Sequence, residues 1–145
     1  MICEAKPNTF HDTFNGVQVT WLHYPRPLLD NLIVSDDIHQ YQMASLLDIG
    51  VMKLIAASQR GAKKDFIDLY ALEQHGVSIA SLISWLSDKF PGISVNYYHI
   101  VKSLVFFEDA ELEPMPRMLI SMDWVVIKDY FIGIQKPLLD FISNQ

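Results

Sequence analysis

The sequence has little of several residue types, and each shortage excludes a class of protein or site. Cysteine occurs once, at Cys3, which excludes an internal disulfide and a zinc site built from cysteines. Basic residues number 11 against 17 acidic ones, and the formal charge of −6 argues against a general binder of nucleic acids or anionic membranes. No apolar run suits a signal peptide or a transmembrane helix, so we expect a cytoplasmic protein without a membrane partner.

Several sequence motifs of common enzymes are also missing. The five histidines show no metal-ligand spacing, and there is no glycine-rich phosphate loop or nucleophile elbow. The sequence is rich in apolar residues: 50% of its residues are hydrophobic and 19% are charged, a composition that excludes a disordered chain. A chain of 145 residues with this composition predicts a single domain, residues 1–145, with a substantial core.

Residues 8–44 have the pattern of a small β portion. Two β-rich runs, Thr9–Phe14 and Val17–Tyr24, flank the dipeptide Asn15-Gly16, which is typical of a two-residue hairpin turn. Two shorter extended pieces are expected near residues 32–34 and 39–43. So few strands need another element to cover their faces and edges.

Residues 45–145 predict a bundle of about five helices. The first, from Leu46 to Ala57, is apolar at nearly every position and has Ser45 as its N-cap, so we expect it to be buried on all sides. The others are expected at residues 63–74, 79–90, 96–107 and 124 to about 134, with Pro137 interrupting the last and 108–113 forming a solvated acidic loop. The fold class is therefore α+β, with a small N-terminal β-hairpin and sheet portion packed against a C-terminal bundle of helices.

The charged residues around the end of the apolar helix are the strongest candidate for a site. Lys53 lies within that helix and Arg60 at the corner after it, while Lys64, Asp65 and Asp68 lie in the first turns of the next helix. Residues three or four positions apart share one face of a helix, so these charges lie close together. Two interpretations remain open: a binding or catalytic site, or structural ion pairs in which Asp68 pairs with Lys64 and Asp65 with Arg60.

Four segments of the chain, in order, resemble a known family. They are VQVTWLHYPRPLL, ASLLDIGVMKLIAA, SQRGAKKDFIDLYAL and SLVFFEDAELEPMPRML, and the resemblance covers nearly all residues from Asn8 to about Lys128. The chain resembles the nucleotidyltransferase-fold proteins of the AbiEii type, the toxin class of type IV toxin–antitoxin systems. The segments RGAKKDFIDLY and FFEDAELEPMP are the most specific part of this resemblance.

The resemblance implies roles for the charged cluster. It implies catalytic roles for Lys53, Asp65 and Asp68, and nucleotide binding by Arg60 and Lys64. The ligands that it implies are a nucleoside triphosphate and Mg²⁺, and the partner that it implies is a cognate antitoxin.

The resemblance also identifies family features that have no counterpart in this sequence. Members have a further N-terminal part, with a small-residue turn for the triphosphate and an Asp-x-Asp pair for the metals, and nothing before Asn8 matches it. A third carboxylate is expected where Thr20 stands, and a hydroxyl cannot replace an anionic ligand of Mg²⁺. We therefore assign no metal ligands, and we expect an N-terminally truncated, nucleotidyltransferase-like chain that is inactive alone.

Three functions remain open at this point. The first is a nucleotide-binding chain that does not catalyse transfer by itself. The second is an oligomeric structural or interaction protein, in which a second copy covers the exposed edge of the sheet. The third is one half of a split nucleotidyltransferase, completed by a complementing N-terminal piece.

Overall fold

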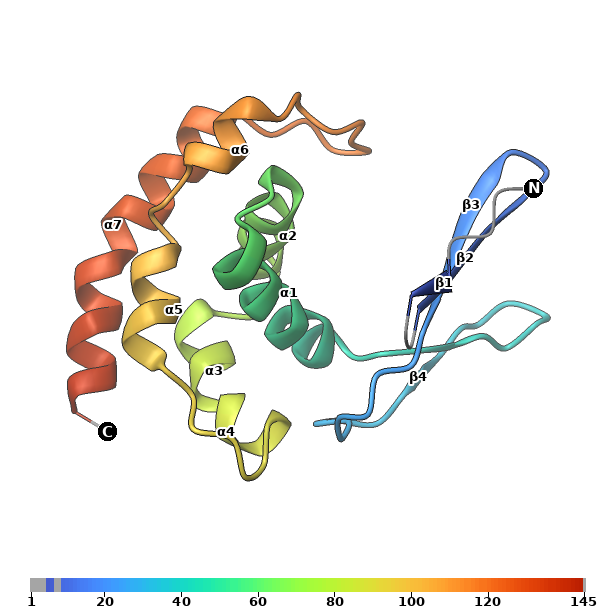
Figure 1. Cartoon of the computed structure of the whole chain (residues 1–145), viewed down its shortest axis with the longest axis horizontal. Coiled ribbons are helices and arrows are strands. Elements are labelled where there is room, and N and C mark those ends of the chain that lie inside the picture. The colour runs from blue at the N-terminus through green and yellow to red at the C-terminus, as the bar shows by residue number, and fades with distance from the viewer. Residues whose placement is uncertain (1–4, 7–8, 145) are drawn as a thin grey trace.

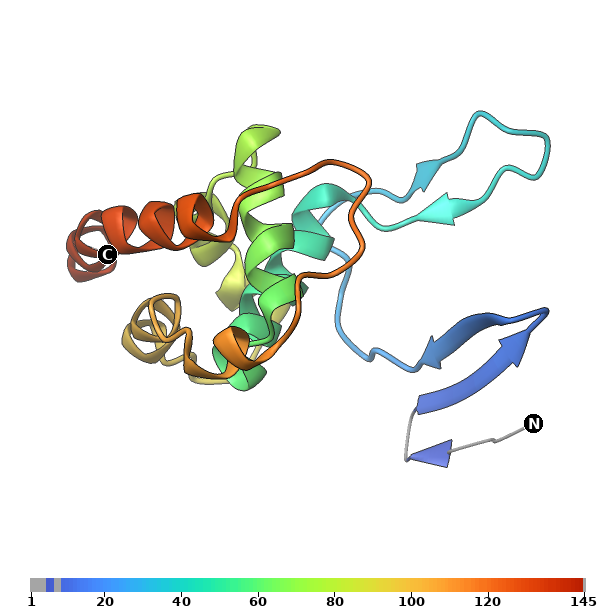
Figure 2. The same ribbon diagram turned by 90° about the horizontal axis from the view of Figure 1, so that it is seen from above.

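The protein consists of two short β-sheets followed by helices, which confirms the α+β fold class. The computed structural model describes residues 5–6 and 9–144, and Cys3 therefore lies outside the described residues. Figures 1 and 2 show a helical part from which the β portion projects.

The β portion contains two antiparallel sheets. In the first, β1 (Ala5–Lys6), β2 (Thr9–Phe14) and β3 (Val17–Leu22) pair in that order, so this sheet begins at Ala5 and not at residue 8. In the second, β4 (Ile33–Val34) pairs with β5 (Gln42–Met43). The predicted hairpin turn is confirmed: Asn15 and Gly16 have φ values of 49° and 81°, which a two-residue turn of this kind requires at both positions.

The described residues form seven helices, more than the sequence predicted. They are α1 (Leu46–Arg60), α2 (Lys63–Gln74), α3 (Ile79–Ser84), α4 (Leu86–Lys89), α5 (Tyr97–Ser103), α6 (Glu108–Leu112) and α7 (Trp124–Ser143). The helix expected at 79–90 is divided at Trp85. The acidic segment expected as a loop forms α6, where the carboxylates of the first turn stabilise the positive end of the helix dipole.

The last helix also differs from its prediction, because α7 continues through Pro137 to Ser143. A proline in a helix interior costs about 3 kcal/mol. Leu138 is 5% exposed and belongs to the hydrophobic core, and Phe141 packs against this core. Burial of these apolar side chains beyond the proline offsets its cost, so tertiary packing overrides the local signal.

The core of the helical part is built around α1 and α2. Val51 and Leu54 of α1 and Phe66 of α2 are fully buried, and the Phe66 ring centre lies 5.5 Å from that of Phe131 in α7. The expectation that α1 is buried on all sides is wrong at its N-terminal end, where Leu46 is 45% exposed. No helix among residues 5–6 and 9–144 combines the length and the apolar character needed to cross a membrane.

The contacts between the β portion and the helices are made by segment 27–30, and not by the faces of the strands. Asp48 of α1 accepts hydrogen bonds from the backbone N–H groups of Leu29 and Asp30, at 2.9 and 3.2 Å. Lys89 of α4 donates to Asp48 at 2.6 Å and to the carbonyl of Pro27 at 2.8 Å. The segment 27–30 is thereby tied to α1 and α4, while both hairpins extend away from the helices (Figures 1 and 2).

Candidate functional site

The corner between α1 and α2 brings the predicted site residues together. Gly61 ends α1 in the left-handed conformation, with φ 59°, and its N–H bonds to the carbonyl of Ala57. Ala62 is extended and α2 begins directly after it. The two helices are therefore antiparallel neighbours, and the last turns of α1 face the first turns of α2.

Asp65 is the centre of the cluster. It is fully buried, and Arg60 binds it with two hydrogen bonds, from Nε to Oδ2 at 2.6 Å and from Nη2 to Oδ1 at 2.8 Å. Lys53 Nζ lies 3.3 Å from Oδ1. Burial raises the pKa of Asp65, but the hydrogen bonds and charges of Arg60 and Lys53 outweigh it and leave the pKa below its ordinary value. Asp65 therefore stays ionised and positions two cations, which does not suit a general base.

Arg60 responds to the same contact in the opposite direction. Its hydrogen bonds to Asp65 raise the pKa of the guanidinium, so both members of this pair remain charged. The side chain of Arg60 is 53% exposed, so this cation also reaches solvent. The predicted structural pair between Asp65 and Arg60 is confirmed.

The predicted pair between Asp68 and Lys64 is wrong. Lys64 is exposed and has no ion pair in the part of the chain that the structure describes. Asp68 instead binds Lys53, with Nζ 2.5 Å from Oδ2. Lys53 reaches Asp68 from α1, across the contact between the two helices, and this pair takes the place of the one expected within α2.

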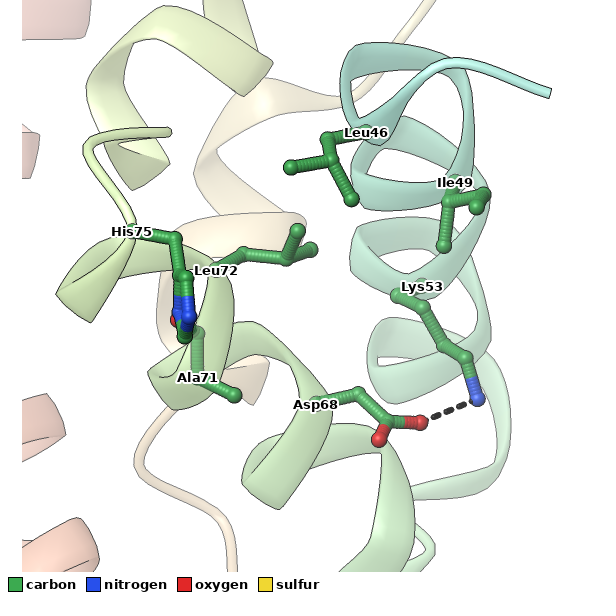
Figure 3. Close-up of a pocket in the computed structure, with 7 residues that line it drawn as sticks. All are labelled: Leu46, Ile49, Lys53, Asp68, Ala71, Leu72 and His75. Atoms are coloured by element: carbon green, nitrogen blue, oxygen red, sulfur yellow. Dashed lines mark hydrogen bonds and ion pairs between the residues drawn. The ribbon is translucent and has the colours of Figure 1, made fainter. Parts of the chain in front are cut away.

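A groove runs between α1 and α2 beside this ion pair, and we call it the α1–α2 groove. It encloses about 360 Å³. Its lining residues come from both helices (Figure 3): Leu46, Ile49, Lys53, Asp68, Ala71, Leu72 and His75. The Lys53–Asp68 pair forms its charged end, and the rest of the lining is mainly apolar.

His75 lies at the other end of the α1–α2 groove. Its Nδ1 is 2.7 Å from the carbonyl oxygen of Ala71. Because a carbonyl oxygen only accepts hydrogen bonds, Nδ1 carries a proton and donates a hydrogen bond to this oxygen. The sequence did not single out this histidine, since its spacing to the charged residues follows no motif.

The cluster does not fit the Mg²⁺ that the resemblance implies. Within residues 5–6 and 9–144 no group of three or more histidine, cysteine or acidic side chains could hold a metal ion. Both oxygens of Asp65 and one oxygen of Asp68 are already bound by cations. Thr20 cannot assist, because it lies on the projecting hairpin, where its Oγ1 is 2.8 Å from Nδ1 of His11.

Sequence reasoning missed two buried lysines. Lys89 pairs with Asp48, as described above. Lys63 is 6% exposed; its Nζ lies 2.5 Å from the carbonyl oxygen of Glu113, and its backbone N–H donates to the Glu113 carboxylate at 2.8 Å. The partners are 41 and 50 positions apart, so no local pattern could have indicated either contact.

Comparison with known proteins identifies a relative without a described activity. The chain is 36% identical over 131 residues to the uncharacterized protein aq_aa25 of Aquifex aeolicus (strain VF5). The alignment covers 90% of this chain and 60% of that protein, so the chain spans about three fifths of the relative's length. No family model matches the sequence. No solved structure matches it either.

Proposed function

We propose that this chain is a nucleotidyltransferase-like protein of the AbiEii type that binds a nucleotide in the α1–α2 groove but does not catalyse transfer by itself. The observation that carries the proposal is the buried carboxylate of Asp65, which lies 3.3 Å from Lys53 Nζ at the charged end of this groove. A nucleotide needs a cation for its phosphates and an apolar cleft for its base, and both lie together here. We also propose a cytoplasmic location, on the sequence alone.

The groove supports specific roles for its residues. Its volume of about 360 Å³ is in the range of small-molecule pockets, which are apolar with a few polar groups. Leu46, Ile49 and Leu72 would contact the base, and Lys53 would donate to the phosphates. Lys53 must then leave Asp68, whose side chain is 46% exposed, so water replaces the lost contact at little cost.

Catalysis by this chain alone is not part of the proposal. Nucleotidyl transfer in the family depends on metal-bound carboxylates, and the described residues offer no such set. Asp65 orients cations, and Asp68 neutralises Lys53. We therefore assign Lys53, Arg60, Asp65 and Asp68 to binding and positioning, and we assign no role to Lys64.

Calorimetric titration with each nucleoside triphosphate tests the proposal. The wild-type chain should release or absorb heat with at least one nucleotide, and Lys53→Ala should weaken that binding at least tenfold. Lys136→Ala is the matched control, because Lys136 is exposed on α7 and carries the same charge. The absence of binding by the wild-type chain would refute the nucleotide-binding function, and equal binding by Lys53→Ala would refute its location.

A second candidate function is an interaction protein, and the projecting hairpin favours it. Phe10 and Trp21 are cross-strand partners, as are Phe14 and Val17, so these four side chains share one face of the sheet. They are 39 to 63% exposed. With 150–250 Å² for each aromatic residue, the three rings alone leave about 300 Å² of apolar surface uncovered. An apolar patch of this size is within the range that monomers expose, where the largest patch is often functional, and this supports the second candidate.

The partner under this second candidate is another copy of the chain or a complementing piece, which adds a strand to the sheet. Light scattering at tens of micromolar should then report a dimer or larger species, and Phe14→Ser should shift it toward the monomer. Ile132→Ser is the control, because Ile132 is 58% exposed on α7, far from the hairpin. If the wild-type chain is a monomer, self-association is refuted. The complementing piece then remains as the partner, and co-expression with a second chain that supplies this piece would test it.

A further inference from the structure

A second groove lies between α1 and α5, and the proposed function does not use it. Two cavities, of about 380 and 400 Å³, lie next to each other and share Ser58, Gln59 and His99 in their linings; together we call them the α1–α5 groove. On its α5 side Asn96, His99 and Ser103 recur at intervals of three and four residues, which places them on one face of the helix. The groove is large enough for a small organic molecule.

Cations line both ends of this groove although the chain as a whole is acidic. Arg60 and Lys102 line one end, and Arg26 lines the other. Neither Arg26 nor Lys102 has an ion pair within residues 5–6 and 9–144. One carboxylate, that of Asp109, is part of the lining, so positive charge is in excess there.

Arg60 still has donors for a ligand in the groove. A guanidinium carries five N–H groups, and Asp65 receives two of them. The remaining donors, on a side chain that is 53% exposed, are free for solvent or for an anion. Lys102 and His99 are also exposed and lie one helical turn apart on α5.

The Arg26 end of the groove offers an apolar surface. Ile55, Phe90, Ile93 and Ile100 line it, and the Arg26 guanidinium lies 5.3 Å from the centre of the Phe90 ring. This stacking holds Arg26 over the groove and leaves its edge available to a polar group. The groove therefore combines an anion-binding end with an apolar wall.

We propose that the α1–α5 groove binds an organic phosphate, whose phosphate group contacts Lys102, Arg60 and His99 and whose apolar or aromatic body lies along Ile55 toward Phe90. Phosphate is favoured over carboxylate because it offers three acceptor oxygens to donors that converge from two helices. This site is separate from the α1–α2 groove and does not require a nucleotide there.

Titration with phenyl phosphate, followed in amide correlation spectra, tests the inference. The shifts should saturate and concentrate at residues 58–60 and 99–103. Lys102→Ala should raise the dissociation constant about fivefold, through the loss of a charge-assisted hydrogen bond, and Asp109→Asn should lower it about twofold, through the loss of a repulsive charge. Lys136→Ala, an exposed change on α7, should leave it unchanged.

Three results would overturn this assignment. Shifts that do not saturate, or that gather elsewhere, would show that the groove binds no organic phosphate. If Lys102→Ala and Lys136→Ala weaken phenyl phosphate binding equally, the effect comes from the overall charge of the protein and not from a contact in the groove. If benzoate binds as tightly as phenyl phosphate, the phosphate group contributes nothing to binding. If inorganic phosphate binds as tightly, the apolar wall contributes nothing.

Discussion

Replacement of Lys89 by methionine should strongly destabilise the protein. Lys89 is 1% exposed and donates to Asp48 at 2.6 Å and to the carbonyl of Pro27 at 2.8 Å. Methionine fills a similar volume without the charge. The substitution therefore leaves the buried carboxylate of Asp48 without its cation and the Pro27 carbonyl without its donor.

The magnitude follows from the contacts that remain at Asp48. Removal of one partner of a buried ion pair costs about 3–5 kcal/mol. Asp48 keeps hydrogen bonds from the backbone of Leu29 and Asp30 and from the Ser45 hydroxyl, so the lower end of that range applies. We expect a loss of about 3 kcal/mol for Lys89→Met, whereas the double variant with Asp48→Asn, which contains neither charge, should lose about 1 kcal/mol.

Urea unfolding followed by tryptophan fluorescence measures this difference. With an m value of about 2 kcal/mol/M, a loss of 3 kcal/mol lowers the midpoint by about 1.5 M. Lys136→Met, an exposed change on α7, should shift the midpoint by less than about 0.3 M. A Lys89→Met midpoint as high as that of the control would show that the ion pair does not tie segment 27–30 to the helices.

Two further predictions concern acid and the corner between the helices. Burial raises the pKa of Asp48, but the hydrogen bonds from Lys89, Leu29, Ser45 and Asp30 together outweigh it and leave the pKa lowered. Burial also raises the pKa of Asp65, and the hydrogen bonds and charges of Arg60 and Lys53 leave it lowered as well. Stability should therefore be full above the unfolded pKa of about 3.9 and fall as the pH decreases through the folded values. A urea midpoint that stays constant from pH 6 to about pH 3 would contradict this direction. Gly61→Ala should lower the free energy of unfolding by about 1 kcal/mol, because Gly61 has a φ of 59°, which residues with a side chain rarely adopt. Steric overlap does not add to this cost, since the new Cβ would meet no atom closer than 3.9 Å. Gly133→Ala, in open space on α7, should instead stabilise the protein by about 0.5 kcal/mol in the same urea assay, and equal effects at the two glycines would contradict the argument.

Features specified by neighbouring residues were predictable from the sequence. The hairpin at Asn15-Gly16 and the N-cap at Ser45 each depend on a few adjacent positions, and the structure places them as expected. The apolar stretch that predicted α1 ends at Ala57, and the helix itself continues to Arg60, one residue before the Gly61 cap. Local signals therefore located the corner that brings the charged residues together.

Features that depend on distant residues were not predictable. The pairing of Asp68 with Lys53 depends on the contact between α1 and α2. The burial of Lys63 depends on Glu113, and the passage of α7 through Pro137 depends on the core that its last turns complete. In each case a contact between elements outweighs a local preference, and no single window of sequence contains both partners.

The most direct test of the proposed site is the nucleotide affinity of Asp68→Asn. In the structure Asp68 neutralises Lys53 at 2.5 Å, and the proposal has phosphate take its place. Removal of this competing charge should tighten nucleotide binding several-fold in calorimetric titration, since the exposed pair is worth about 0.2–1 kcal/mol. Tighter binding by Asp68→Asn that the further substitution Lys53→Ala abolishes would support the α1–α2 groove as a nucleotide site. Unchanged or weaker binding by Asp68→Asn would contradict it.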